Sequence, residues 1–534
     1  MSPSYLESLE DNIKIDKDKC IFCGRCADRC ILDNIRMKLA PCRQACPMGV
    51  NVQGYVQLIA RGEFDQAREL VREKLPFPEI VCLVCDHPCE SSCERGKTSG
   101  QPVSIRALKR FLFDASARTE ALEKAPTTGK RVAVIGAGPA GLVAAHDLAV
   151  KGHEVVVYEA GARPGGMLAG GIPAFRLPAA VVVKELEVLA QLGVALRCNC
   201  VVGADVTLAQ LMNEHDAVIL SAGLWKSKKL GLDGEDMPGI HAGLPFLCAS
   251  KAGKGPKLSG TVLVSGGGNM AVGAAMTALR QGAENVIMLA LEGEGQLPAF
   301  AAELRQAAAE GVLFRHSCGI ERLERRDGRF SGAVLSRCVA VFDENGRFAP
   351  RFETSGESIR ADALIVAIGQ DRDASILEGC GIGLDAVSMA DPLTLQCGDS
   401  KVFVAGDYKG GAGSVVKAMA SGREAAESAS RHVSGEHLRF ERGYAGPVLT
   451  DFPIDHQRGE DAPRREPLTD TLKTAGNDTV LEKPYTREEA IGEAKRCHSC
   501  GGPCGHNRTC WFCLPCEVEC PQKALWVDIP YLLR

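Results

Sequence analysis

The chain has 534 residues, of which 45% are hydrophobic and 24% are charged. At roughly 100 to 200 residues per domain, this length predicts three or more packed domains. The formal net charge of -5 and the lack of a long basic run argue against nucleic acid or an anionic membrane as a partner. The N-terminus has no apolar signal region, and the most apolar stretch, 132–145, is too short to span a bilayer. We therefore expect a soluble, cytoplasmic protein without membrane insertion.

Cysteine is unusually frequent near both ends of the chain, where 17 of the 24 cysteines form clusters. A cytosolic protein has little use for disulfides, so thiols at such short spacings are candidate metal ligands. The first run has the C-x2-C-x2-C-x3-C spacing of a 4Fe-4S ferredoxin, with Ile31 where proline is usual. Apolar residues at helical spacing follow it and predict a helical iron–sulfur domain. The candidate ligands of this part are Cys20, Cys23, Cys26, Cys30, Cys42, Cys46, Cys82, Cys85, Cys89 and Cys93.

The sequence VIGAGPAGL at 134–142 lies between a β-branched run and a helical pattern. Gly136, Gly138 and Gly141 allow the backbone to approach a pyrophosphate at the N-terminus of that helix. Glu159 ends the next predicted strand, 23 residues after Gly136, where a carboxylate can accept hydrogen bonds from a ribose. This context predicts a dinucleotide site.

A second motif, SGGGNMA, repeats the arrangement with Gly266, Gly268, Asn269 and Ala271. The strand that follows ends at Glu292, without an arginine. A carboxylate suits the free 2'-hydroxyl of NAD and repels the 2'-phosphate of NADP, so NADH is favoured over NADPH. Glu292 could instead be a solvated loop acid, and Glu294 could take the same role.

The C-terminal cysteines follow a Pro- and charge-rich stretch that reads as an extended linker, and a helix predicted by the capping pattern of TREEAIGEAKRC. One run again has ferredoxin spacing and ends in Cys-Pro. Seven thiols fall one short of two four-thiolate clusters, which leaves a non-cysteine ligand such as His498 or His506, or a zinc ribbon, as alternatives. We expect Trp511 and Phe512 to shield a cluster from water. The candidate ligands are Cys497, Cys500, Cys504, Cys510, Cys513, Cys516 and Cys520.

Residues 42–435 resemble the flavoprotein small subunit of glutamate synthase and its relatives. The matching stretches are CRQACP, HPCESSCERG, VAVIGAGPAGL, EAGARPGGMLAGGIPAFRLP, GGGNMA and VFVAGDYKGGAGSVVKAMASGREAA. The resemblance implies FAD in the first site and a nicotinamide cofactor in the second. Gly273, Met276 and the pair Leu291-Glu292 depart from the family pattern in the second site. The residues implied to line the FAD site are Gly136, Gly138, Gly141, Glu159, Gly166, Met167, Arg176, Gly406 and Asp407.

The resemblance also implies one cluster held by Cys46, Cys85, Cys89 and Cys93, with Cys42 and Cys82 left for another that borrows ligands, perhaps from the run at 20–30. In all we expect three or four 4Fe-4S clusters. The predicted fold is α/β, with two nested Rossmann-like domains. The predicted segments are a ferredoxin-like segment at 1–36, a helical iron–sulfur domain at 37–125, the FAD domain at 126–255 and 359–435, the NAD(P) domain at 256–358, a linker at 436–484 and a ferredoxin-like domain at 485–534.

These parts predict an electron-transfer flavoprotein. NADH exchanges a hydride with FAD, and single electrons then pass through the clusters to or from a catalytic redox subunit or a ferredoxin. No general acid or base is needed, so the chemistry rests with FAD. Two alternatives stay open: the small subunit of glutamate synthase, and a non-enzymatic relay with a degenerate nicotinamide site.

Overall fold

The computed structural model describes residues 12–31, 33–114, 123–442, 446–456, 458–471, 479–505 and 510–529. The chain forms two compact units. Unit 1 contains Met1–Ala121, Arg439–Leu468 and Glu482–Arg534, and unit 2 contains Leu122–Leu438 and Thr469–Leu481. Within the described residues, every helix is too short or too polar to cross a membrane.

Unit 2 contains two parallel five-stranded sheets. The first has the strand order β17-β6-β3-β4-β5, which is the doubly wound order of a dinucleotide-binding fold. Strands β3 and β6 are buried almost throughout, as strands covered by helices on both faces must be. The elements are β3 (Arg131–Ile135), α10 (Pro139–Val150), β4 (Glu154–Tyr158), η1 (Gly166–Leu168), α11 (Ala179–Gln191), β5 (Ala195–Arg197), α12 (Leu208–Glu214), β6 (Ala217–Leu220), η2 (Ser375–Leu377), α16 (Leu384–Ser388), β17 (Val402–Val404), α17 (Asp407–Gly410) and α18 (Val415–Ser434).

The second sheet repeats the same order as β11-β10-β9-β15-β8 and carries a three-stranded antiparallel sheet, β12-β13-β14. Two short strands, β7 (Lys226–Ser227) and β16 (Gln370–Asp371), pair where the chain passes between the two domains. The other elements are β8 (Ile240–Ala242), α13 (Gly243–Lys251), β9 (Thr261–Ser265), α14 (Asn269–Arg280), β10 (Asn285–Leu289), α15 (Ala301–Ala309), β11 (Leu313–Arg315), β12 (Cys318–Arg326), β13 (Arg329–Phe342), β14 (Phe348–Arg360) and β15 (Ala363–Val366).

This topology differs from the domain boundaries expected at 255 and 359. Strand β8 and helix α13 lie before 255 but belong to the second domain, where β8 joins the sheet. Strand β15 lies after 359 but pairs with β9 and β8 of the same sheet. The exchange therefore occurs at the β7–β16 pair. A short apolar strand such as β15 suits the interior of either sheet, so its composition does not indicate which sheet it joins.

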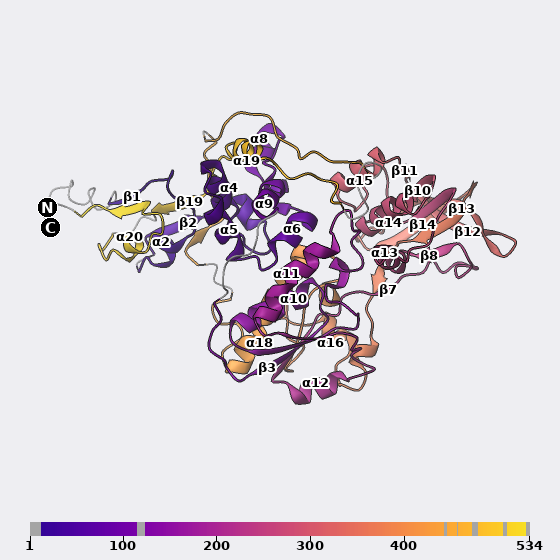
Figure 1. Cartoon of the computed structure of the whole chain (residues 1–534), viewed down its shortest axis with the longest axis horizontal. Coiled ribbons are helices and arrows are strands. Elements are labelled where there is room, and N and C mark those ends of the chain that lie inside the picture. Colours follow the sequence, from indigo (N-terminus) through magenta and orange to yellow (C-terminus); the bar gives the residue numbers. More distant parts are fainter. Residues whose placement is uncertain are drawn as a thin grey trace. The chain divides into compact units, whose positions relative to one another are not determined.

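Unit 1 interleaves segments from the two ends of the chain (Figure 1). Its helical part packs α19 against α4. Asn51 caps α4 by accepting from the N–H of Gly54, and its side-chain amide donates to the carbonyl oxygens of Ile21 and Phe22. The elements are α3 (Pro41–Gln44), α4 (Val52–Arg61), α5 (Phe64–Arg72), α6 (Pro78–Val84), α7 (Pro88–Ser91), α8 (Glu94–Ser99), α9 (Ile105–Phe113) and α19 (Arg487–Ala494).

The two ferredoxin-like segments expected at 1–36 and 485–534 form one structure. Strand β1 (Ile13–Ile15) pairs antiparallel with β20 (Leu525–Val527), and α2 (Arg25–Asp28) packs against α20 (Pro515–Val518). A second small sheet joins β18 (Val448–Leu449), β2 (Ile35–Lys38) and β19 (Gly502–Gly505). Figure 1 shows the N-terminal strands in indigo beside the C-terminal strands in yellow.

The stretch expected as a surface linker at 436–484 is extended but not free. Strand β18 pairs with β2, and Arg464 forms an ion pair of 2.8 Å with the buried Glu90. Arg106 also forms an ion pair with Glu482. These contacts hold the described residues of the stretch that belong to unit 1 against the N-terminal part of that unit. The capping pattern, in contrast, predicts α19 correctly, because Thr486 and Glu489 form a capping box.

Candidate electron-transfer sites

The first glycine loop joins β3 to α10 where the strand order of the first sheet reverses. Gly136 has φ of 93°, and a Cβ on Gly141 would lie 2.0 Å from the carbonyl oxygen of Gly136. Gly138 faces open space, since a Cβ there would meet nothing within 4 Å. Helix α10 begins directly after it without a side-chain cap, so backbone N–H groups of its first turn are available to a phosphate.

Glu159 follows β4 and lies against this loop, where the sequence places it. Its carboxylate accepts hydrogen bonds of 2.7 Å from the N–H of Ala137 and 2.7 Å from the N–H of Gly161. Each carboxylate oxygen has a further lone pair that can accept a ribose hydroxyl. Glu159 therefore has the fixed orientation that such a role requires.

Two more glycines from the implied FAD site approach the same loop. Gly166, with φ of 54°, lies so close that a Cβ would meet Cα of Gly138 at 2.8 Å, and Met167 shares its 3-10 turn. Gly406, with φ of 65°, packs against Ala140 at 2.9 Å from its would-be Cβ. The structure thus brings distant predicted residues together around the start of α10.

Asp407 and Arg176, two further residues of the implied FAD site, differ in how far other protein groups already engage their charged ends. Asp407 begins α17, and burial raises its pKa while a hydrogen bond from the Gly413 backbone lowers it in part. Arg176 instead forms an ion pair of 2.7 Å with Glu303 on α15, in the second domain. Its guanidinium is therefore engaged within the protein.

The second glycine loop, between β9 and α14, repeats these features. Gly266 has φ of 136° and Gly268 faces open space. Asn269 begins α14 and accepts a hydrogen bond of 2.8 Å from the N–H of Phe300, while Ala271 is fully buried. A Cβ on Gly267 would meet a carboxylate oxygen of Glu292 at 2.7 Å. Glu292 therefore lies against the loop, as predicted for a group that contacts the ribose.

In unit 1, we group sixteen of the clustered thiols into four sets of four: two sets each line one pocket, and each of the other two is grouped because its members influence the pKa of one shared side chain. A cubane binds one thiolate at each of its four irons, so its ligands surround a space instead of converging on one ion. Among the described residues, no three His, Cys, Asp or Glu side chains converge as ligands of a single metal ion would. Two of the sets surround recognisable pockets.

Two sets exchange their fourth member between the ends of the chain. Cys20, Cys23 and Cys26 line one pocket together with Cys520. In the other set, burial together with the nearby Cys30, Cys510 and Cys513 raises the pKa of Cys516 to about 11. This crossing is the pattern of two-cluster ferredoxins, in which the fourth cysteine of each run ligates the other cluster.

The third set lies in the helical part and contains Cys46, Cys82, Cys85 and Cys89. Burial raises the pKa of the Cys89 thiol well above its usual value, and Cys85 and Cys46 add to the shift. All four thiols raise the pKa of the buried Lys109, against the lowering that burial causes. Lys109 lies on α9, which packs against α6 and α7. The resemblance implies Cys93 in place of Cys82 in this set, whereas Cys93 lines the pocket of Cys42 and Cys82 is among the thiols that influence Lys109.

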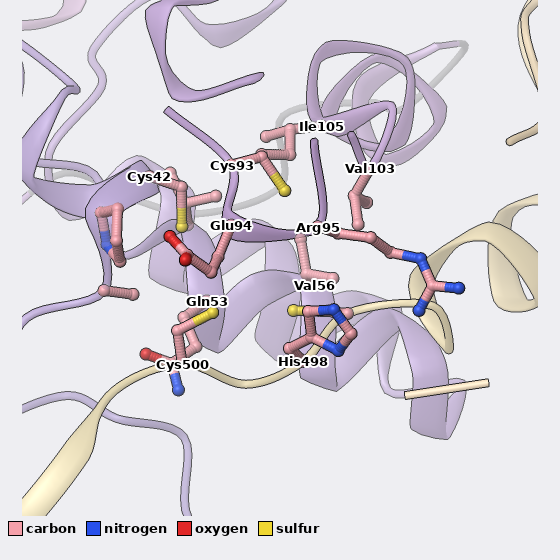
Figure 2. A pocket seen from close by; sticks show the side chains of 14 residues that line it. Cys42, Gln53, Val56, Cys93, Glu94, Arg95, Val103, Ile105, His498 and Cys500 are labelled. Carbon is pink, nitrogen blue, oxygen red and sulfur yellow. The ribbon is translucent and has the colours of Figure 1, made fainter. Parts of the chain in front are cut away.

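The fourth set contains Cys42, Cys93, Cys497 and Cys500, which line one pocket (Figure 2). Figure 2 shows the sulfurs of Cys42, Cys93 and Cys500 turned towards a shared space. Two members come from each end of the chain. The cysteine spacing does not predict this set, because spacing groups each C-terminal thiol only with thiols that are close to it in the sequence.

Some candidates stand apart from these sets. Burial raises the pKa of Cys504, on β19, and the charges of Lys38, Arg36 and Lys17 lower it in part. Other thiols are not among these influences. Trp511 is 71% exposed, so it does not cover a cluster as expected, whereas Phe512 packs against the core that contains the thiols. His506 lies outside the described residues.

The chain is similar to two protein families. Residues 130–422 match the model of the pyridine nucleotide-disulphide oxidoreductases. Residues 10–121 match that of the dihydropyrimidine dehydrogenase domain II, 4Fe-4S cluster. Among solved structures, FprA from Mycobacterium tuberculosis matches with a TM-score of 0.50 and 20% identity over 57% of this chain and 85% of that one. This last likeness concerns the fold alone.

Several curated proteins are similar over most of the chain. The NADP(+)-dependent formate dehydrogenase subunit beta of Moorella thermoacetica is 35% identical over 77% of this chain, which spans only 61% of that protein. The NADPH-Fe(3+) oxidoreductase subunit beta of Geobacter sulfurreducens is 30% identical over 86% of this chain and 75% of its own length. The glutamate synthase [NADPH] small chain of Escherichia coli is 32% identical over 79% and 92%.

Proposed function

The chain belongs to the pyridine nucleotide-disulphide oxidoreductase family, and from this premise we propose that it is the electron-transferring flavoprotein subunit of a larger redox enzyme. It passes electrons between a nicotinamide dinucleotide, FAD and a series of 4Fe-4S clusters. The observation that carries this proposal is that one chain combines two parallel sheets, each with a strand–glycine loop–helix motif, with two pockets that are each lined by four thiols.

The first crevice fits the pyrophosphate of FAD. Gly138 leaves room that a Cβ would fill, α10 offers backbone donors, and Glu159 is positioned for a ribose. We assign Gly136, Gly141, Gly166, Met167, Gly406 and Asp407 to the same site. A bound flavin supplies the conversion between two-electron and one-electron transfer. The protein residues bind and orient it, and no side chain is required as an acid or base.

The second crevice is assigned to the nicotinamide cofactor, with Gly266, Gly268, Asn269 and Ala271 around the phosphates. Glu292 follows β10 and lies against the glycine loop, and it favours NADH because a carboxylate there repels a 2'-phosphate. The runner-up is NADPH, since the names of all three relatives contain NADP(+) or NADPH.

The thiol sets follow one another through unit 1. Burial raises the pKa of Tyr55, and the nearby thiols add to the rise: Cys89, Cys82 and Cys46 of one set and Cys42 of the next. Burial lowers the pKa of Arg43, and both Cys23 and Cys42 oppose this shift. Arg43 also donates a hydrogen bond of 3.0 Å to the carbonyl oxygen of Phe22. On these shared neighbours we propose that electrons pass from the set of Cys46 through that of Cys42 to the ferredoxin-like pair.

The ferredoxin-like pair is the proposed exchange point with the partner. Cys513 is exposed, and Ile31, Trp511 and Val518 beside the same set are each more than 70% exposed. A cluster there lies near the surface, where a protein acceptor can approach it. We propose a catalytic oxidoreductase subunit or a ferredoxin as this partner. Glutamate synthesis with a large subunit is the alternative, favoured by the 92% coverage of the glutamate synthase small chain.

Stopped-flow mixing of the anaerobic holoprotein with NADH or NADPH tests the function. We expect the flavin absorbance to bleach faster with NADH, and cluster absorbance to fall afterwards. Bleaching only by NADPH would overturn the choice of cofactor. A flavin that neither nucleotide reduces would leave the chain as a relay. Glutamine-dependent oxidation of the nucleotide with a co-purified large subunit would support glutamate synthesis.

A further inference from the structure

We propose that the two ends of the chain jointly hold one 4Fe-4S cluster, with Cys42 and Cys93 from the N-terminal part and Cys497 and Cys500 from the C-terminal part as its four thiolate ligands. The inference deepens the proposed function, since it places this cluster in the middle of the electron path. It concerns a ligand set that neither stretch contains by itself.

The four cysteines are held by separate elements around one pocket. Cys42 lies in α3, Cys93 is the N-cap of α8, Cys497 follows α19, and Cys500 precedes β19. Ala40, Val52, Val56, Val103 and Ile105 form apolar parts of the lining. Each iron of a cubane needs one thiolate, and an apolar lining excludes water from it. The donor set and its surroundings therefore fit the group.

Hydrogen bonds to other parts of unit 1 flank the C-terminal pair of thiols. Before it, Arg496 is fully buried and donates to the carbonyl oxygens of Gln101 and Ala462, at 2.8 Å each. Between and after the two thiols, the amide of Gln53 donates to Ser499 and to the carbonyl oxygen of Gly501, at 3.2 Å each. The Cys497–Cys500 loop is thus fixed at both of its ends against the N-terminal part.

Close approach of the backbone makes this placement specific. A Cβ on Gly501 would lie 2.2 Å from the carbonyl oxygen of Lys38, so only glycine fits. Immediately afterwards β19 pairs with β2 in a fixed register, with Gly502 opposite Lys38. The thiol of Cys500 is therefore brought to the pocket by strand pairing.

Two other side chains in the pocket are less suitable ligands. Glu94 forms an ion pair of 3.0 Å with Lys97. His498 is buried, with Nδ1 2.5 Å from the carbonyl oxygen of Arg458, and among the described residues its Nε2 has no hydrogen-bond partner. Four thiols already complete the coordination of a cubane, so His498 is expected to line the site without binding iron.

Iron content and electron paramagnetic resonance of the full chain, purified without oxygen, test the ligand set. Cys42→Ser and Cys500→Ser should each remove about four irons per chain and the same reduced-cluster signal. The double variant should lose no more than either single variant. Cys504→Ser is the matched control from β19, the strand that follows Cys500, and should keep all iron, as should His498→Ala. Separate signals lost by the two single variants, or a loss of about eight irons in the double variant, would overturn the proposal.

Cys500→Asp guards against a variant that simply unfolds. A carboxylate can still bind iron, so this variant should keep its iron while the signal of one cluster shifts and the others stay unchanged. An unaltered spectrum would exclude Cys500 as a ligand. The outcome is independent of the proposed nucleotide chemistry, because dithionite can reduce the clusters without NADH. If the proposed function fails, wild-type flavin is not bleached by either nucleotide, whereas failure of this inference appears only in the variants.

The same variants test the position of the cluster in the path. With Cys500→Ser, NADH should still bleach the flavin at the wild-type rate, because unit 2 contains both nucleotide sites. Electrons should reach a protein acceptor at least tenfold more slowly, because the middle step is missing. An unchanged rate to the acceptor would show that this cluster lies off the path.

Discussion

The buried ion pair between Glu493 and Arg496 should decide whether the C-terminal thiols stay in place. Both side chains are fully buried and lie 2.6 Å apart; Arg496 directly precedes Cys497, and Glu493 lies one turn earlier. Glu493 also accepts hydrogen bonds of 2.9 Å from the N–H of Ser104 and 2.9 Å from the N–H of Arg465. Arg496→Met leaves this carboxylate buried without its cation. Breaking a buried pair in this way costs about 3–5 kcal/mol of unfolding free energy.

The measurement is thermal unfolding of the anaerobic holoprotein, followed by loss of cluster absorbance. For a unit of about 200 residues, each kcal/mol lowers the midpoint by about 2–4 °C, so Arg496→Met should lower it by about 6–20 °C. The control is Lys495→Met, which removes an exposed ion pair of 3.6 Å with Glu460 and should cost at most about 1 kcal/mol. A double change, Glu493→Leu with Arg496→Met, should recover part of the loss. Equal midpoints for Arg496→Met and Lys495→Met would refute the reasoning.

Three further outcomes follow from the two units. Gly141→Ala should disrupt the first domain, since its Cβ would meet the Gly136 carbonyl oxygen at 2.0 Å, whereas Gly138→Ala should fold normally and lose flavin, as circular dichroism and flavin content would report. Should both variants retain wild-type flavin, the loop would not be the pyrophosphate site. Glu292→Arg should raise the ratio of kcat/KM for NADPH over NADH by at least tenfold, while Glu294→Arg should change it little; an equal response would assign no special role to Glu292. Cys30→Ser and Cys513→Ser should each remove about four irons, and their combination no more, whereas additive losses would contradict the crossed ferredoxin sets.

Local patterns predict much of unit 2 and its loops. The glycines of both motifs, Glu159 and Glu292 lie where the strand–turn–helix pattern places them. These features are local, because the loop, the helix and the following strand end are close in sequence. The capping box at Thr486 is local in the same sense.

Features that depend on distant partners could not be read in the same way. Strand β15 has the composition of a buried strand, but its partners β9 and β8 lie about 100 residues or more before it in the sequence, so no local pattern indicates the pairing. The grouping of thiols is a stronger case. Cys520 belongs with Cys20, Cys23 and Cys26 although nearly the whole chain lies between them, so spacing could indicate that clusters exist but not which thiols share one.

This arrangement makes unit 2 an insertion within unit 1. Three of the four thiol sets take members from both ends of the chain, so unit 1 must close over the intervening 300 residues or more. The entropy of loop closure grows only with the logarithm of loop length, and each doubling costs about 0.6 kcal/mol. Strand pairs such as β1–β20 and buried contacts such as that of Arg496 can offset a cost of this size. Ligands shared between the two ends then join the closing of unit 1 to the completion of the electron path, because neither end can supply four thiolates to the set around Cys42.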